Sequence, residues 1–192
     1  IPDLKATVLL MSYFKNKNLS NDELKLLEQN GVRCVNPAKT NFKNISLVNQ
    51  TTMLYTDTFE ISEYLSKHYQ TEQINFNFCR TICKATLNRQ SAAMKLIEEK
   101  SPDLVLVVGG YDSSNTNNLF KMASSNVKLT LFIKDCDSFT NSSILYYYPP
   151  KKKILKQNIN ILNNANRIAI LAGASCPISV VKKVIEKLKS LF

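Results

Sequence analysis

The sequence of 192 residues contains no apolar run that approaches the roughly 20 residues needed to span a bilayer. No charged segment followed by an apolar one opens the chain, so we expect neither membrane insertion nor secretion. Low-complexity tracts and repeats of fixed period are also missing. With 44% hydrophobic and 21% charged side chains, the composition is that of a globular protein, long enough for one domain or two small ones.

Histidine is nearly absent, because His68 is the single one in the sequence. The five cysteines are odd in number and scattered, which favours a reducing compartment over a disulfide framework. Cys79 and Cys83 are separated by three residues, which is not a common spacing for zinc ligands, and one histidine adds no second pair. We therefore expect no structural zinc site, and we interpret His68 as a solvated residue in the last turn of a helix.

Arginine is scarce, although the formal net charge is +10. Four of the 25 cations are arginine and 21 are lysine. A basic chain suggests nucleic acid or an anionic substrate as partner, but phosphate recognition prefers the bidentate arginine fork. The charge is also uneven, because residues 151–192 hold nine cations against Glu186 alone. Any electrostatic partner should meet this C-terminal region, where the lysines of the last predicted helix form either a solvated face or a docking surface.

Short apolar runs alternate with stretches of helical period, a pattern that predicts an α/β fold of parallel-sheet strand-helix units. We expect two units, residues 1–70 and 71–192, and a basic C-terminal helix. Residues 71–78 and 137–143 have no clear period and are candidate seams. The predicted strands cover residues 6–12, 32–35, 45–48, 104–108, 129–133, 144–148 and 168–171.

Three predicted strand-to-helix junctions share one chemical character. Hydroxyl or amide side chains follow the strands in Gln50-Thr51-Thr52, in residues 109–115 and in Gly173-Ala174-Ser175. Ligands of parallel α/β sheets bind beyond the carboxyl ends of strands, where helix N-termini offer N–H groups to an anion. One hydroxyl cap is ordinary, but three in one chain favour a phosphate or diphosphate pocket.

Cys83 stands just before a predicted helix start, with Thr86 and Gln90 in the turns that follow. The helix dipole lowers the pKa of a thiol in that position. The residues around it carry a resemblance that extends to other parts of the chain.

Four blocks resemble, in the correct order, the second half of the IspH (LytB) family of iron–sulfur 4-hydroxy-3-methylbut-2-enyl diphosphate reductases. The resemblance is strong over about residues 45–192 and weak over residues 1–37. It implies three α/β units, of which this chain has two, around a four-iron four-sulfur cluster held by three cysteines. It also implies electrons from a ferredoxin or flavodoxin. The blocks are NQTT, RTICKATLNRQSAA, VLVVGGYDSSNTNNL and ILAGASCPISVV.

The resemblance also assigns roles to individual residues. Cys83 resembles a cluster ligand, and Thr51 resembles the threonine near the substrate hydroxyl. Four residues resemble the groups that hold the substrate diphosphate, and two more support the helix start behind the cluster. The diphosphate residues are Ser113, Ser114, Asn115 and Ser175, and the supporting residues are Thr86 and Gln90.

Parts of the family pattern are missing. No block matches the first cluster cysteine or the catalytic glutamate, and Phe14 and Asn36 stand where the family has a substrate-binding histidine and the second cluster cysteine. Cys83 alone cannot hold a cluster. We therefore expect no cofactor in this chain alone and interpret it as a degenerate member without reductase activity, a basic structural or binding subunit of a larger assembly of proteins, or of proteins and RNA.

Two alternatives stay open. The chain is the C-terminal part of an active reductase with an iron–sulfur cluster, or it binds a prenyl or nucleoside diphosphate without reacting it. In each case we expect a reducing compartment, a plastid, a mitochondrion or the bacterial cytoplasm.

Overall fold

The computed structural model describes residues 3–16, 20–29, 31–32, 43–72 and 74–192. The chain forms two compact units, one of Ile1–Gln50 with Tyr55–Thr81 and one of Thr51–Leu54 with Ile82–Phe192. The sequence-based division was placed after residue 70. In the structure the short segment Thr51–Leu54 belongs to the second unit, although the first unit precedes and follows it in the chain.

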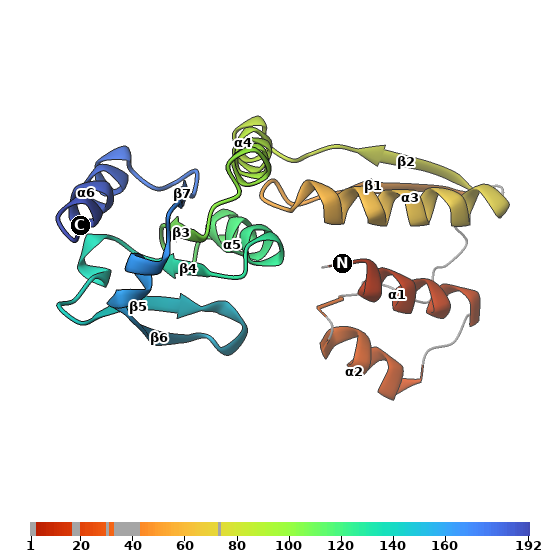
Figure 1. Ribbon diagram of the computed structural model, residues 1–192. Coiled ribbons are helices and arrows are strands. Elements are labelled where there is room, and N and C mark those ends of the chain that lie inside the picture. The colour runs from red at the N-terminus through yellow and green to blue at the C-terminus, as the bar shows by residue number, and fades with distance from the viewer. Residues whose placement is uncertain (1–2, 17–19, 30, 33–42, 73) are drawn as a thin grey trace. The chain divides into compact units, whose positions relative to one another are not determined.

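Among its described residues, the first unit contains a two-stranded parallel sheet and three helices (Figure 1). Its strands run in register from Asn44 opposite Asn75 to Val48 opposite Cys79, and each alternates exposed with half-buried residues. The elements are α1 (Leu4–Asn16), α2 (Asn21–Gln29), β1 (Asn44–Val48), α3 (Tyr55–Thr71) and β2 (Asn75–Cys79).

Reciprocal hydrogen bonds join the two residues that follow these strands. The Asn49 N–H donates to Thr81 Oγ1 at 2.9 Å, and the Thr81 N–H donates to Asn49 Oδ1 at 3.0 Å. The chain therefore leaves β1 and β2 at adjacent points, just before Thr51 and Ile82.

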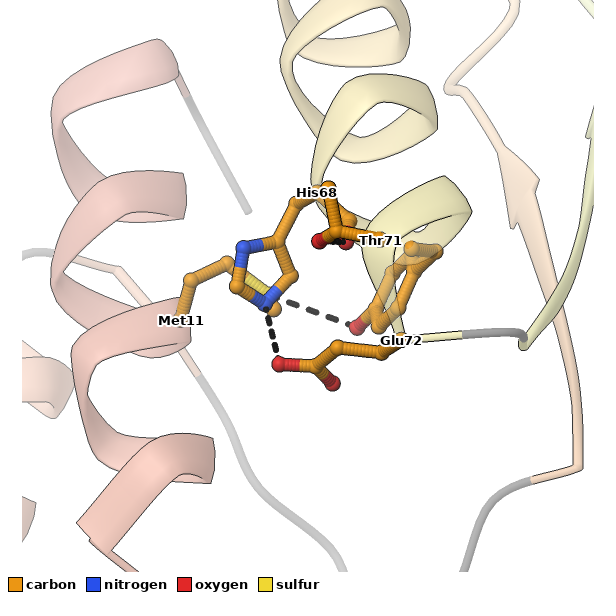
Figure 2. A network of polar contacts seen from close by, with 5 residues as sticks. Met11, His68, Thr71 and Glu72 are labelled. Atoms are coloured by element: carbon orange, nitrogen blue, oxygen red, sulfur yellow. Dashed lines mark hydrogen bonds and ion pairs between the residues drawn. The ribbon is translucent and has the colours of Figure 1, made fainter.

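Tyr69 of α3 connects this helix to α1. Its side chain is 5% exposed, and its hydroxyl donates to Met11 Sδ at 3.3 Å. Burial, with a smaller contribution from the Glu72 charge, raises the pKa of Tyr69 to about 12. Figure 2 shows Met11 beside His68 and Glu72, which pair at 3.3 Å between Nε2 and Oε1. His68 lies in the last turn of α3, as predicted, but its side chain is only 12% exposed, so the expectation of a solvated residue was wrong.

The second unit is a five-stranded sheet with helices on both faces (Figure 1). The strand order is β6-β5-β4-β3-β7; β3 pairs in parallel with β4 and β7, whereas β5 is antiparallel to β4 and β6. Three short 3-10 turns cover Cys136–Ser138, Pro149–Lys151 and Ile159–Asn164. The other elements are α4 (Lys84–Lys100), β3 (Leu104–Val108), α5 (Ser114–Asn126), β4 (Thr130–Ile133), β5 (Ser143–Tyr148), β6 (Lys153–Asn158), β7 (Ile168–Ala172) and α6 (Ile178–Lys189).

All five residues of β3 are fully buried. Because side chains alternate across a strand, Val105 and Val107 pack with residues of α4 and α5 on one face. Leu104, Leu106 and Val108 pack on the other face with Val184 and Leu188 of α6. The continuous apolar run is typical of a strand covered on both faces, and it positions the carboxyl end of β3 rigidly.

The predicted α/β class with parallel strand-helix units is confirmed, and strands lie at five predicted places. The strand predicted at residues 6–12 was wrong, because these residues belong to α1. A short apolar run suits a buried helix as well as a strand, and Asp3 favours the helix by accepting the Ala6 N–H at 2.8 Å. Of the predicted strand 32–35, residues 33–35 lie outside the described residues, as does Asn36.

Two strands were not predicted, β2 and β6. The sequence Asn-Phe-Asn-Phe-Cys of β2 alternates polar and aromatic residues, a period-two signal within the segment 71–78 that had been interpreted as a seam. On α6, Val184 and Leu188 are buried, whereas Ile185 is 36% exposed.

Candidate functional site

The site predicted from the sequence lies wholly in the second unit, at the carboxyl ends of β3 and β7. The two strands are parallel and in register, with Val108 opposite Ala172. Both strands therefore end at the same edge of the sheet, and the segments that lead into α5 and α6 begin side by side. This places Ser113, Ser114 and Asn115 near the loop that contains Ser175.

Ser113 caps α5, and its Oγ accepts the Thr116 N–H at 3.3 Å. Ser114 is exposed, and it follows the cap in the first turn, where backbone N–H groups and the positive end of the helix dipole attract an anion.

Asn115 is the most unusual residue of this turn. It is 3% exposed, and neither Nδ2 nor Oδ1 has a hydrogen-bond partner among the residues that the structure describes. Leaving a buried amide unpaired costs about 1–3 kcal/mol for each group. The side chain is therefore suited to a partner that comes from outside the protein, at the N-terminus of α5.

Thr116 fills the space between the two strand ends. It is fully buried, and its Oγ1 also lacks a partner within the described part of the chain. A Cβ atom on Gly173 would lie 2.1 Å from this oxygen, and one on Gly109 would lie 2.8 Å from it. Gly109 also has φ +154°, a conformation that side chains disfavour. The two glycines thus allow α5 to approach β3 and β7 closely.

Cys83 caps α4 at the other side of the site. The Thr86 hydroxyl lies 3.0 Å from Cys83 Sγ, and the Thr86 N–H donates to the same sulfur at 3.3 Å. These hydrogen bonds, with the side chain of Thr86 the largest cause, hold the pKa of the Cys83 thiol below its ordinary value. Cys83 is exposed whereas Thr86 is buried, so the thiol is accessible and its partner is fixed.

Thr51 is fastened close to Cys83, because the Cys83 N–H donates to the Thr51 carbonyl at 3.1 Å. Gln90, which is 4% exposed, donates from Nε2 to the Met53 carbonyl at 2.9 Å. The fold therefore holds Thr51 against Cys83 and Met53 against Gln90.

Arg89 and Asn118 contact the site and were not among the predicted site residues. Arg89 Nη1 donates to the Ala172 carbonyl at 3.2 Å, at the end of β7, and Asn118 Nδ2 donates to the Thr52 carbonyl at 2.6 Å. The contacts join residues 83 and 66 positions apart, so no local pattern could indicate them. Burial raises the pKa of the Cys176 thiol, and the positive charge of Arg89 offsets part of this rise.

Among the described residues, no group of three or more His, Cys, Asp or Glu side chains lies close enough to hold a metal ion. Within the same residues, no helix is long and apolar enough to cross a membrane.

Small and polar residues lie at adjacent parallel strand ends, beside an exposed thiol of lowered pKa at a helix start, and such strand ends are where parallel α/β folds bind ligands. The family model described as LytB protein matches residues 9–189, and the chain belongs to this family.

Curated relatives and a solved structure agree with this assignment. The chain is 38% identical over 154 residues to the 4-hydroxy-3-methylbut-2-enyl diphosphate reductase of Prochlorococcus marinus (strain MIT 9515), covering 76% of this chain and 38% of the relative. The reductase of strain NATL1A is 32% identical over 197 residues, covering 98% of this chain and 49% of the relative. The chain thus spans about half the length of these relatives or less.

The structure of the E-1-hydroxy-2-methyl-but-2-enyl-4-diphosphate reductase from Plasmodium falciparum resembles this chain with a TM-score of 0.59 and 24% identity. The match covers 95% of this chain and 56% of that one. It supports the α/β fold.

Proposed function

We propose that this chain is the diphosphate-binding part of a 4-hydroxy-3-methylbut-2-enyl diphosphate reductase. The observation that carries the proposal is Asn115, a buried amide with both polar atoms unpaired among the described residues, at the N-terminus of α5. The names of the curated relatives supply the substrate class. Their cyanobacterial origin favours a plastid or the bacterial cytoplasm as the compartment.

The diphosphate would bind where α5 begins. Ser113, Ser114 and Asn115 offer hydroxyl, amide and backbone N–H donors on one turn, and Ser175 offers a hydroxyl from the end of the neighbouring strand β7. Charge-assisted hydrogen bonds to an anion are stronger than neutral ones, and the dipole of the 13-residue helix adds to them. Thr51, fastened beside Cys83, would then meet the hydroxyl end of the substrate.

The family implies an iron–sulfur cluster, and Cys83 is the residue of this chain that bears on it. Cys83 fits as one ligand, because its thiol is exposed and has a lowered pKa, and a bound cluster would supply electrons for removal of the substrate hydroxyl. The described residues bring no further ligands to Cys83 in a group of three or more. By themselves, the described residues do not fit the cluster.

A second candidate function is favoured by the charge distribution. Residues 151–192 carry nine cations and one anion, and Lys182, Lys183 and Lys189 are exposed on α6. In this interpretation the chain has no reductase activity and is a basic binding subunit of a larger assembly, with the diphosphate pocket retained or unused.

Titration calorimetry with inorganic pyrophosphate tests the diphosphate site. We expect the double variant Ser113→Ala with Ser175→Ala to weaken binding at least about tenfold, since each lost hydrogen bond to a charged group is worth about 1.5–3 kcal/mol. The matched control is Ser124→Ala with Ser125→Ala. It removes two hydroxyls that donate to the Lys121 carbonyl near the other end of α5, and it should leave the pyrophosphate affinity unchanged. If the unmodified chain does not bind pyrophosphate, the proposed site is wrong.

Anaerobic reconstitution with iron and sulfide separates the two candidate functions. If the unmodified chain acquires iron, labile sulfide and visible absorbance, and the Cys83→Ser variant does not, the result supports the reductase. A chain that binds pyrophosphate but takes up no iron supports the binding subunit.

A further inference from the structure

The segment Thr51–Leu54 is attached to the second unit through three consecutive backbone carbonyls. The Thr51 carbonyl accepts from the Cys83 N–H at 3.1 Å, and the Thr52 carbonyl accepts from Asn118 Nδ2 at 2.6 Å. The Met53 carbonyl accepts from Gln90 Nε2 at 2.9 Å. The three donors come from the cap of α4, from the second turn of α4 and from the second turn of α5.

This arrangement determines where the side chains of the segment lie. A short loop usually has its carbonyls in water and can move, whereas here each of three successive carbonyls has a protein donor. Leu54, at the end of the segment, is only 6% exposed. With its backbone held at three points, the segment presents Thr51 and Thr52 at fixed positions next to the N-termini of α4 and α5.

Two of the three donors are neutral side-chain amides, and this has an electrostatic consequence. A lysine or arginine in the place of Asn118 or Gln90 could also donate to a carbonyl, but its charge would attract the diphosphate away from the N-terminus of α5. An amide holds the loop and leaves the field of the helix termini to direct the anion.

We propose that Asn118 and Gln90 are positioning residues that fasten Thr51–Leu54 so that the Thr51 hydroxyl meets the hydroxyl end of the substrate while α5 binds the diphosphate. This inference rests on the proposed function; it adds Asn118 to the site and gives Gln90 a positioning role in it. It predicts that loss of the amides affects recognition of the organic part of the substrate and not recognition of the diphosphate.

The test compares two ligands, 4-hydroxy-3-methylbut-2-enyl diphosphate and inorganic pyrophosphate, by calorimetry on the full chain. We expect Asn118→Leu to weaken binding of the diphosphate ester about five- to tenfold, the effect of about one hydrogen bond, and to leave pyrophosphate affinity within about twofold. Gln90→Leu should act in the same direction. Asn118→Gln keeps a side-chain amide and should retain most of the affinity for the diphosphate ester.

Asn126→Leu is the matched control. Asn126 also lies on α5, but it donates to the Met122 carbonyl within the helix, away from the segment. We expect this variant to bind both ligands as the unmodified chain does. If Asn118→Leu does not fold, Asn118→Ser, which keeps a polar and smaller side chain, takes its place.

Hydrogen exchange provides a readout that does not depend on a ligand. The Cys83 amide, which donates to the Thr51 carbonyl, should exchange about fivefold faster or more in Asn118→Leu, because the segment loosens. The Leu106 amide in the buried interior strand β3 serves as the reference, and its exchange rate should not change. An unchanged Cys83 amide, or an equal loss of affinity for both ligands, overturns the positioning role.

The outcomes distinguish the two proposals. If the unmodified chain binds neither ligand, the proposed function fails, and the exchange of the Cys83 amide alone decides whether the amides hold the segment.

Discussion

Cys83 has two roles that depend on the same contacts. As the cap of α4, its sulfur accepts the Thr86 N–H, and as a thiol next to the Thr86 hydroxyl it ionises more readily than an ordinary cysteine. The contrast with Cys176 is informative, because burial raises the pKa of that thiol even with Arg89 nearby. Within the second unit, accessibility and lowered pKa therefore coincide at Cys83.

Thr86→Val tests this account, since valine has nearly the same shape but no hydroxyl. The hydrogen bond with the Thr86 side chain is the largest cause of the lowered pKa of Cys83, so its loss should move this pKa upward towards its ordinary value. At neutral pH the thiolate fraction then falls, and we expect alkylation of Cys83 by iodoacetamide to slow about threefold or more, with its pH profile displaced to higher pH.

Mass spectrometry of the Cys83 peptide measures the alkylation rate. Cys79 lies in β2 of the other unit and serves as the internal control, with an unchanged rate. A Cys83 rate equal to that of the unmodified chain would show that the hydroxyl does not stabilise the thiolate.

At the scale of the elements, the close approach of α5 to β3 and β7 depends on two glycines. Thr116 occupies the space where side chains on Gly109 and Gly173 would lie. This packing carries the first turn of α5, and with it Asn115, to the edge of the sheet where both strands end.

Gly173→Ala should destabilise the second unit by about 1–3 kcal/mol, because its Cβ would lie 2.1 Å from Thr116 Oγ1 and the core must shift. The double variant with Thr116→Ala removes the contacting oxygen and should recover most of the loss. Urea unfolding, monitored by circular dichroism, measures the free energy of unfolding of the single and the double variant.

Gly110→Ala is the matched control, because a Cβ there meets no atom within 4 Å. We expect the free energy of unfolding of this variant to stay within about 0.5 kcal/mol of that of the unmodified chain. If Gly173→Ala and Gly110→Ala reduce the free energy of unfolding equally, the contact with Thr116 is not what requires glycine at position 173, and the backbone conformation is.

At the scale of the whole molecule, the +10 charge comes mostly from the C-terminal region. Residues 1–150 contain 16 cations and 14 anions, a balance of +2, and residues 151–192 supply the remaining +8. A diphosphate site at the start of α5 does not need these lysines, so the charge is a separate property of the chain and bears on the second candidate function.

The binding-subunit function predicts that the chain binds single-stranded poly(U) RNA with an affinity that falls steeply with salt. Lys182→Gln, Lys183→Gln and Lys189→Gln together should reduce the slope of log affinity against log salt concentration by about 2, since each contact with a single strand contributes about 0.7. Fluorescence anisotropy across a salt series measures the slope.

Lys67→Gln, Lys95→Gln and Lys100→Gln remove the same charge from α3 and α4 and are the control. Affinity that does not change with salt, or equal slopes for the two triple variants, contradicts a role of α6 in RNA binding.

The sequence by itself determined the strands that are buried on both faces and the chemistry at their ends. β3 was predicted at its observed bounds, because five consecutive apolar residues between Pro102 and Gly109 suit only a covered strand or a short buried helix, and the flanking turn residues exclude the helix. The hydroxyl and amide residues after β3 and β7 follow from the same local pattern. By contrast α1 was mistaken for a strand, since its apolar run lacks a decisive period.

The tertiary structure alone decided which of these residues meet. Thr51–Leu54 is followed by 27 residues of the first unit, Tyr55–Thr81, yet it is held by Asn118, Gln90 and Cys83 of the second. Likewise Thr116, the neighbour of Asn115 in α5, packs against two glycines from different segments. Local propensity acts over a few residues, whereas hydrogen bonds between residues 66 or 83 positions apart exist only once the sheet has brought its strand ends together.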